Sequence, residues 1–203
     1  MMKALCGEFF GTALMVGVGC GSVAAGADHL TVSLTFGAVV TLAILLFGPL
    51  SGAHINPAVS IAFWRDGQLE GVKVVPYITA QCLGALTAAM LLNGAAPTEV
   101  AHEVPLVNAF LLEITITLAL MVSILFVVQR TTSRGNVAVW VGLTVALLAY
   151  LVGPLTGASM NPARTFGPNA VSGLWSTLPF FFTSTVLGAW LACDVKERWF
   201  PDR

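Results

Sequence analysis

Residues 48–58 read GPLSGAHINPA, and residues 153–163 read GPLTGASMNPA. The two stretches are versions of one motif separated by 105 residues, and a third pair, Glu8 and Glu113, has the same separation. One register shared by three separate matches is typical of an internal repeat. The chain is therefore predicted to be a single domain, residues 1–203, made of two related halves at about 1–104 and 105–203.

The composition places this repeat in a membrane. Hydrophobic residues make up 57% of the 203 residues and charged residues only 9%, whereas a soluble domain carries about 25% charged residues. Residues 30–64 contain no Asp, Glu, Lys or Arg, and residues 135–193 contain only Arg164. A net charge of −1 offers no basic surface for nucleic acid. We therefore expect an integral membrane protein in contact with lipid, and exclude a soluble enzyme and a nucleic-acid-binding protein.

Six segments are apolar and long enough to cross a bilayer as helices, which takes about 20 residues each. We predict them at residues 4–27, 31–49, 72–93, 106–129, 137–153 and 178–195. Two further apolar stretches, 50–66 and 154–174, are interrupted by Gly and Pro and are interpreted as re-entrant segments. Irregular backbone at membrane depth is tolerated only inside protein or beside a water-filled cavity. Each half holds an odd number of spans, so we expect an inverted repeat.

Lys and Arg are distributed unevenly about these spans. All of them except Arg164 fall on the side of the two termini, and the opposite loops carry Asp28, Glu99 and Glu103. Cytoplasmic loops are enriched in Lys and Arg. We therefore predict that both termini are cytoplasmic.

Each copy of the motif ends in Asn-Pro-Ala, at Asn56-Pro57-Ala58 and Asn161-Pro162-Ala163. Asn is a preferred N-cap and Pro is favoured at the first helical position, so each motif is predicted to begin a short helix, over 57–64 and 162–170. An inverted repeat brings these helices together N-terminus to N-terminus near the midplane. Each N-terminus carries about +0.5 charge and unpaired amide donors. Their meeting point, to which the two Asn amides add donors, would repel cations and donate hydrogen bonds to oxygen.

On these residues the chain resembles the aquaporin family of major intrinsic proteins, over essentially its full length. The carrying stretches are SGAHINPAV at 51–59, GASMNPAR at 157–164 and EFFGT at 8–12. The resemblance implies an all-α membrane protein, a right-handed bundle of six tilted transmembrane helices with two re-entrant half-helices. It further implies a homotetramer with one pore per subunit, in the cell inner membrane if the source is bacterial. The implied function is passive conduction of water and small uncharged solutes, excluding protons and ions.

The resemblance also implies roles for particular residues. Glu8 and Glu113 would accept hydrogen bonds from backbone amides of the re-entrant loops and so turn carbonyl groups toward the pore. Those carbonyls, which would accept from permeating hydroxyls, belong to Ala53, His54, Ile55, Ala158, Ser159 and Met160. A proton relay is the alternative reading of the two glutamates, because acidic residues inside a membrane are often functional. His54 faces the pore or is held by a structural hydrogen bond, while His29 and His102 are expected in loops.

The positions that form the narrowest point of the family's pore can be assigned in this chain by their spacing from the two Asn residues. They are Phe36, Ala149, Ala158 and Arg164. Water-selective members have His at the position of Ala149, and glycerol channels have a bulky aromatic residue at that of Ala158. Both differences remove side-chain volume, so we expect a wider constriction than in a strict water channel, with Phe36 as its apolar wall and Arg164 as its main donor.

The substrate is less sharply indicated than the class of protein. Glycerol channels have Asp after the filter Arg and a Pro-Leu pair early in the last span, where this chain has Thr165 and Phe181-Phe182. A channel mainly for larger neutral solutes, such as glycerol, urea, arsenite or boric acid, remains an alternative. A secondary transporter with broken helices is another, although its coupling-ion site would need a carboxylate near the breaks. The sequence contains no HExxH, GxSxG or Cys/His cluster, so we predict no enzyme, cofactor or metal site.

Overall fold

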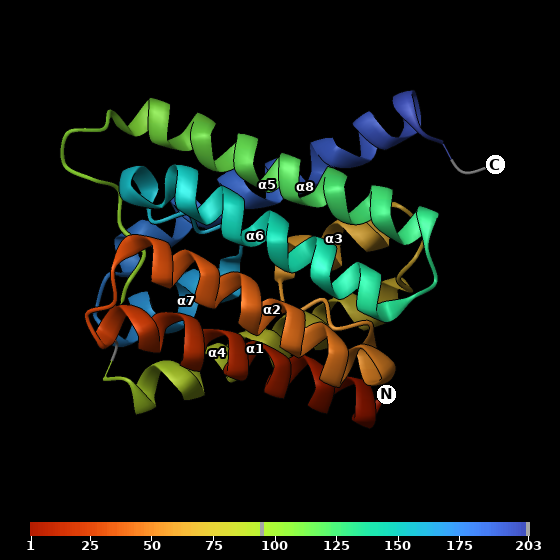
Figure 1. Cartoon of the computed structure of the whole chain (residues 1–203), viewed down its shortest axis with the longest axis horizontal. Helices are drawn as coiled ribbons and strands as arrows, with labels where there is room; N and C mark the ends of the chain where they lie inside the picture. The colour runs from red at the N-terminus through yellow and green to blue at the C-terminus, as the bar shows by residue number, and fades with distance from the viewer. Residues whose placement is uncertain (94–95, 202–203) are drawn as a thin grey trace.

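The computed structural model describes residues 1–93 and 96–201, and the regular elements of the described part are helices, with no strand. Figure 1 shows long helices that lie nearly side by side, with two short helices between them. The elements are α1 (Met2–Ala24), α2 (His29–Ser51), α3 (Pro57–Arg65), α4 (Gly71–Leu91), α5 (Leu106–Arg130), α6 (Arg134–Thr156), α7 (Pro162–Val171), a short 3-10 turn η1 (Trp175–Thr177) and α8 (Leu178–Trp199).

The six predicted spans are confirmed. In the described part, α1, α2, α4, α5, α6 and the segment Trp175–Trp199 are long and apolar enough to cross a membrane. The two short helices α3 and α7 fall within the predicted re-entrant segments and begin at the prolines of the Asn-Pro-Ala motifs. The chain therefore has the expected bundle of six spans and two half-helices.

The predicted ends of two spans were too early. We placed them at Pro49 and before Pro154, but α2 continues to Ser51 and α6 to Thr156. A proline inside a helix lacks one amide hydrogen bond and crowds the carbonyl four residues before it. The helical turn still continues past Pro49 and Pro154, because the backbone nitrogens of Gly52 and Gly157 donate to the carbonyls of Gly48 and Gly153. The helices end instead at Gly52 and Gly157, whose φ angles of +89° and +76° are left-handed and suit glycine.

The packing follows the repeat. In the first half α1 packs on α2 and α4, and in the second half α5 packs on α6 and α8. The two halves exchange their short helices, since α3 packs on α8 and α7 packs on α4, while α2 and α6 pack on each other. Such reciprocal contacts are those of an inverted repeat. The N-termini of α3 and α7 meet inside the bundle, where Asn56 bonds to Met160 and Asn161 bonds to Ile55.

Two glycines allow the close helix pairs. A Cβ atom on Gly84 in α4 would lie 2.2 Å from the backbone oxygen of Phe9 in α1, and one on Gly188 in α8 would lie 2.4 Å from that of Ile114 in α5. No side chain fits at either distance. Helices in membranes use small residues in this way to bring their backbones into contact.

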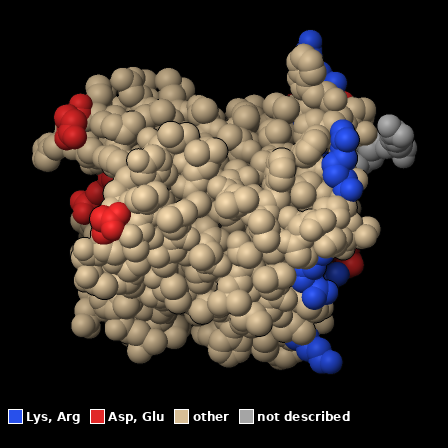
Figure 2. Space-filling view, viewed as in Figure 1, with Lys and Arg blue, Asp and Glu red and all other residues tan. Residues whose placement is uncertain are grey.

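The two ends of the bundle differ in charge. Both termini lie at one end, which we call the terminal end, and the loops after α1 and α4 lie at the other, the far end (Figure 1). On the face shown in Figure 2, Lys and Arg gather at the terminal end and most of the visible Asp and Glu at the far end. Between them this face shows no charged residue, as expected of a belt in contact with lipid.

Candidate functional site

One cavity of about 430 Å³ is lined by residues from both ends of the bundle. One wall is formed by apolar side chains of the long helices, among them Val40, Ile44, Leu120, Ile124, Val141 and Val145. The other wall is formed by the segments 52–56 and 157–161, which precede the half-helices. The cavity is thus apolar on one side and lined by exposed backbone on the other.

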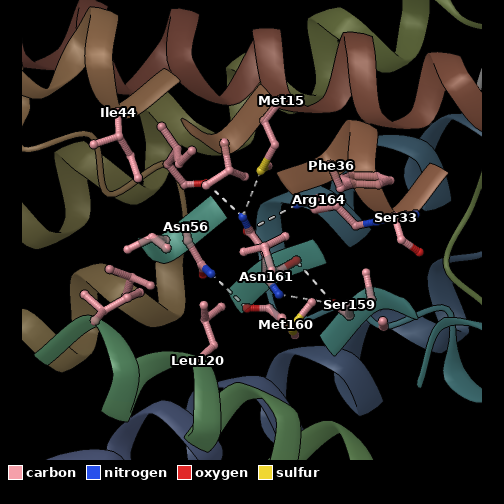
Figure 3. Close-up of a pocket in the computed structure, with 18 of the residues that line it drawn as sticks. Met15, Ser33, Phe36, Ile44, Asn56, Leu120, Ser159, Met160, Asn161 and Arg164 are labelled. Atoms are coloured by element: carbon pink, nitrogen blue, oxygen red, sulfur yellow. Dashed lines mark hydrogen bonds between the residues drawn. The ribbon is translucent and has the colours of Figure 1, made fainter. Parts of the chain in front are cut away.

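The two Asn-Pro-Ala motifs meet at the centre of this cavity (Figure 3). Asn56 caps α3 by accepting a hydrogen bond from the backbone nitrogen of Ala58 at 2.9 Å, and Asn161 caps α7 by accepting from that of Ala163 at 2.9 Å. Each Asn also reaches across the pseudo-symmetry axis. Asn56 Nδ2 donates to the carbonyl of Met160 at 2.8 Å, and Asn161 Nδ2 donates to the carbonyl of Ile55 at 2.8 Å. A reciprocal pair of hydrogen bonds therefore joins the two segments at the midplane.

The second amide hydrogen of the two Asn residues has different surroundings. Asn161 Nδ2 also lies 3.7 Å from the sulfur of Met15, which is only 4% exposed (Figure 3). The residue that corresponds to Met15 in the second half is Leu120, whose side chain has no acceptor. Sequence reasoning missed the contact between Met15 and Asn161. The repeat register pairs Met15 with Leu120 and so shows that the two halves differ at this position.

The segments before the half-helices hold four non-glycine residues in the left-handed region. They are Ala53, Ile55, Ala158 and Met160, with φ between +41° and +50°. Such a conformation costs of order 1–3 kcal/mol per residue and persists only where the surroundings enforce it.

Two buried glutamates supply that enforcement. Glu8 accepts from the backbone nitrogens of His54 at 2.9 Å and Ile55 at 2.7 Å, and also from Gln81 Nε2 at 2.7 Å. Glu113 accepts from the backbone nitrogens of Ser159 at 3.0 Å and Met160 at 3.2 Å, and also from the hydroxyl of Thr156 at 2.6 Å. Both side chains are 0% exposed. Because the amides of both segments point toward the glutamates, their carbonyl groups are left for the cavity.

The six carbonyl groups expected to accept from a permeating molecule are not equivalent. Those of Ile55 and Met160 already accept a bond from the opposite Asn, which leaves each oxygen one further lone pair. Among the described residues no donor contacts the carbonyls of Ala53, His54, Ala158 and Ser159.

The four residues of the predicted constriction line the same cavity: Phe36, Ala149, Ala158 and Arg164. The guanidinium carbon of Arg164 lies 5.3 Å from the centre of the Phe36 ring. Arg164 Nη1 donates to the hydroxyl of Thr98 at 2.5 Å and to the carbonyl of Ala96 at 3.2 Å. No carboxylate of a described residue forms an ion pair with it. A full positive charge therefore faces the cavity, held by neutral oxygens.

Two histidines also line the cavity. His54 lines the cavity and is also held by a structural hydrogen bond, since its Nδ1 lies 3.1 Å from the hydroxyl of Ser60. The prediction that His29 lies in a loop was wrong. Asp28 caps α2, so His29 is its first residue, and its Nε2 donates to the carbonyl of Tyr150 at 2.8 Å beside the far mouth. In the described residues no three His, Cys, Asp or Glu side chains could hold a metal ion.

Comparison with known proteins agrees with this architecture. The family model described as "Major intrinsic protein" matches residues 1–195. Aquaporin AqpM of Methanothermobacter thermautotrophicus is 35% identical, over 86% of this chain and 78% of its own. The glycerol uptake facilitator protein of Haemophilus influenzae is 35% identical, over 94% and 92%. The crystal structure of the aquaglyceroporin from Plasmodium falciparum superposes with a TM-score of 0.90 at 25% identity, over 98% and 96%.

The hydrogen bonds of the two glutamates generate a prediction. In Glu8→Gln or Glu113→Gln the amide keeps one acceptor but turns an NH₂ group toward a backbone N–H. Each loses charge-assisted bonds, so the free energy of unfolding should fall by about 2 kcal/mol, while the ratio of solute to water flux of the folded fraction should hardly change. Thermal unfolding in detergent and flux in liposomes measure the two quantities.

Glu70→Gln is the matched control, since Glu70 is exposed and forms an ion pair with Lys73 three residues on. The proton relay would instead be supported if the parent showed a proton-coupled flux and the Glu8 and Glu113 variants lost this flux while keeping normal stability.

Proposed function

Since this chain belongs to the major intrinsic protein family, we propose that its cavity is the conducting pore and that the two Asn-Pro-Ala motifs and Arg164 select what passes. The protein is a multi-pass membrane channel that conducts water and small neutral solutes passively. The observation that carries the proposal is the meeting of α3 and α7 inside one cavity, with Asn56 and Asn161 bonded crosswise.

The conduction path follows the polar wall. A molecule that enters from the terminal end meets carbonyl groups of residues 53–55, then the Asn amides, then carbonyl groups of residues 158–160. It can exchange its bonds with water for bonds to these groups one at a time. The apolar wall opposite offers no partner, so a permeating water is oriented by one side of the pore only. Oriented, single-sided hydrogen bonding is a means by which such pores pass water.

Protons and cations are rejected by two sources of positive potential. The opposed N-termini of α3 and α7 each contribute about half an elementary charge at the midplane. Arg164 contributes a whole charge nearer the far end, and it forms no ion pair with a described carboxylate. Neutral molecules feel neither barrier.

A second candidate function is passage of neutral solutes larger than water. Ala149 and Ala158 both line the cavity and both carry the smallest side chain after glycine, so of the four constriction residues Phe36 and Arg164 supply the bulk. The relatives include both an aquaporin and a glycerol uptake facilitator, at the same 35% identity. Water is proposed as the main substrate, and glycerol, urea, arsenite or boric acid as further permeants that this width admits.

We also propose a membrane topology and an assembly for the channel. Lys and Arg gather at the terminal end (Figure 2), which supports cytoplasmic termini. In a bacterium the protein would then lie in the inner membrane. We propose that residues 1–203 form a single channel domain of two inverted halves, about 1–104 and 105–203, and that four copies assemble with one pore each.

The width of the constriction can be tested at Ala149. In Ala149→His the added ring would face Phe36 and fill space that larger solutes need, so glycerol flux should fall about tenfold more than water flux, which corresponds to about 1.4 kcal/mol in the barrier. Stopped-flow light scattering on the same liposomes gives both rates. Ala149→Ser is the control and should leave the ratio of the two rates unchanged. An unchanged ratio in the His variant would show that Ala149 does not line the constriction.

The charge at the far mouth can be tested at Arg164. Arg164→Ala removes both the charge and the bulk, so it should admit protons or small cations and raise the ratio of glycerol to water flux about tenfold. Arg164→Lys keeps the charge and should still exclude protons. The measurements are the decay of a pH gradient and osmotic swelling in one preparation. Proton flux that stays at the parent's level in Arg164→Ala would remove Arg164 from the filter.

A further inference from the structure

The loop between α4 and α5 carries a threonine that is buried more deeply than the residues around it. Thr98 is 0% exposed, whereas Glu99 beside it is exposed. The loop also lies on the segment that forms the wall of the cavity, because a Cβ atom on Gly157 would come within 2.9 Å of Thr98 Cγ2. Thr98 is therefore placed directly behind the residues of the predicted constriction.

The backbone of Thr98 is held by a single side chain of α7. Its nitrogen donates to Asn169 Oδ1 at 2.7 Å, and its carbonyl accepts from Asn169 Nδ2 at 2.8 Å. Asn169 is itself 0% exposed and donates to the hydroxyl of Thr177 at 2.8 Å. A side-chain amide that pairs with both polar groups of one residue fixes that residue in position and orientation.

The hydroxyl of Thr98 is thereby presented to Arg164. It accepts from Arg164 Nη1 at 2.5 Å, the shortest of the distances to this side chain, and from the hydroxyl of Thr165 at 3.1 Å. The only other acceptor that a described residue offers to the guanidinium is the carbonyl of Ala96, at 3.2 Å. Both acceptors are neutral, so they direct the group without cancelling its charge.

Among the described residues this arrangement is found at α7 and has no counterpart at α3. The residue that corresponds to Arg164 in the first half is Val59, and the half-helix α3 is fastened at its end by ions instead. Lys196 Nζ lies 2.7 Å from Asp66 Oδ2, and Arg65 pairs with Asp194. The uncharged contacts of Thr98 are thus made to α7, the half-helix that places the cationic side chain of Arg164 at the pore.

We propose that Thr98 is a positioning residue for the filter: its hydroxyl, held in place by Asn169, sets how far the guanidinium of Arg164 extends toward Phe36. The inference rests on the proposed filter role of Arg164. Without the hydroxyl the long Arg side chain keeps one carbonyl partner and gains room to swing away from Phe36. The pore then widens at its narrowest level, and the positive charge is no longer fixed on its axis.

The experiment compares three variants with the parent in liposomes. Thr98→Val keeps the shape of the side chain and removes the hydroxyl, and it should raise the ratio of glycerol to water flux about tenfold, the order expected for losing one hydrogen bond to a charged group. Proton leakage should rise with it. Thr98→Ser keeps the hydroxyl and should return both quantities to within about twofold of the parent.

Thr185→Val is the matched control. Thr185 is also 0% exposed, but its hydroxyl donates within its own helix, to the carbonyl of Phe181 at 2.6 Å. This variant should lose a similar amount of thermal stability and keep the parent's flux ratio. If the role of Thr98 were purely structural, Thr98→Val would behave in the same way and would also keep the parent's flux ratio. If Thr98→Val is not recovered folded, Thr98→Ala serves, with a change in the same direction.

The outcomes separate the inference from the function on which it rests. If Arg164→Ala changes the flux ratio and folded Thr98→Val does not, Thr98 has no positioning role and the filter assignment stands. If neither variant changes the ratio, the filter assignment and the inference both fail. A changed ratio in Thr98→Val that Thr98→Ser restores supports the inference.

Discussion

The crosswise pair of hydrogen bonds between Asn56 and Met160 and between Asn161 and Ile55 is the interaction on which the rest of the structure depends. Two chain segments that are not helical must lie at the centre of a bilayer, where lipid offers no partner to a peptide group. The Asn side chains join the segments, Glu8 and Glu113 take up their amides, and the left-handed residues turn their carbonyls to the cavity. The polar wall of the pore consists of the carbonyl groups that these bonds leave facing the cavity.

The two halves repeat this plan but differ where selection is proposed. At the midplane, Met15 faces Asn161, and the corresponding Leu120 of the other half offers no acceptor. At the ends, α3 is tied to α8 by ion pairs, whereas α7 is tied to the α4–α5 loop by Asn169 and Thr98. A pore built from two similar halves thus has one charged mouth.

The sequence predicted the repeat, the six spans and the two half-helices because these follow from patterns along the chain: a shared register, apolar length and Asn-Pro N-caps. The ends of α2 and α6 were misplaced because Pro49 and Pro154 are tolerated in a last helical turn, and the left-handed glycines that follow end the helices. The contacts of Met15, His29 and Thr98 join residues more than 60 positions apart in sequence, as with Thr98 and Arg164 at 66. Local pattern carries no signal for such pairs. Phe36, Ala149, Ala158 and Arg164 were located through the family resemblance, and all four line one cavity, as the proposed filter requires.

Two opposed half-helices and one arginine that forms no ion pair with a described carboxylate are proposed to let water through and keep protons out. The most direct test is to measure both fluxes for the unaltered protein in the same liposomes, with osmotic shrinkage for water and an internal pH dye under an imposed potential for protons. We expect water permeability well above that of empty liposomes, with proton flux equal to theirs. Proton flux that rises together with water flux, or folded protein that leaves water flux unchanged, would contradict this proposal.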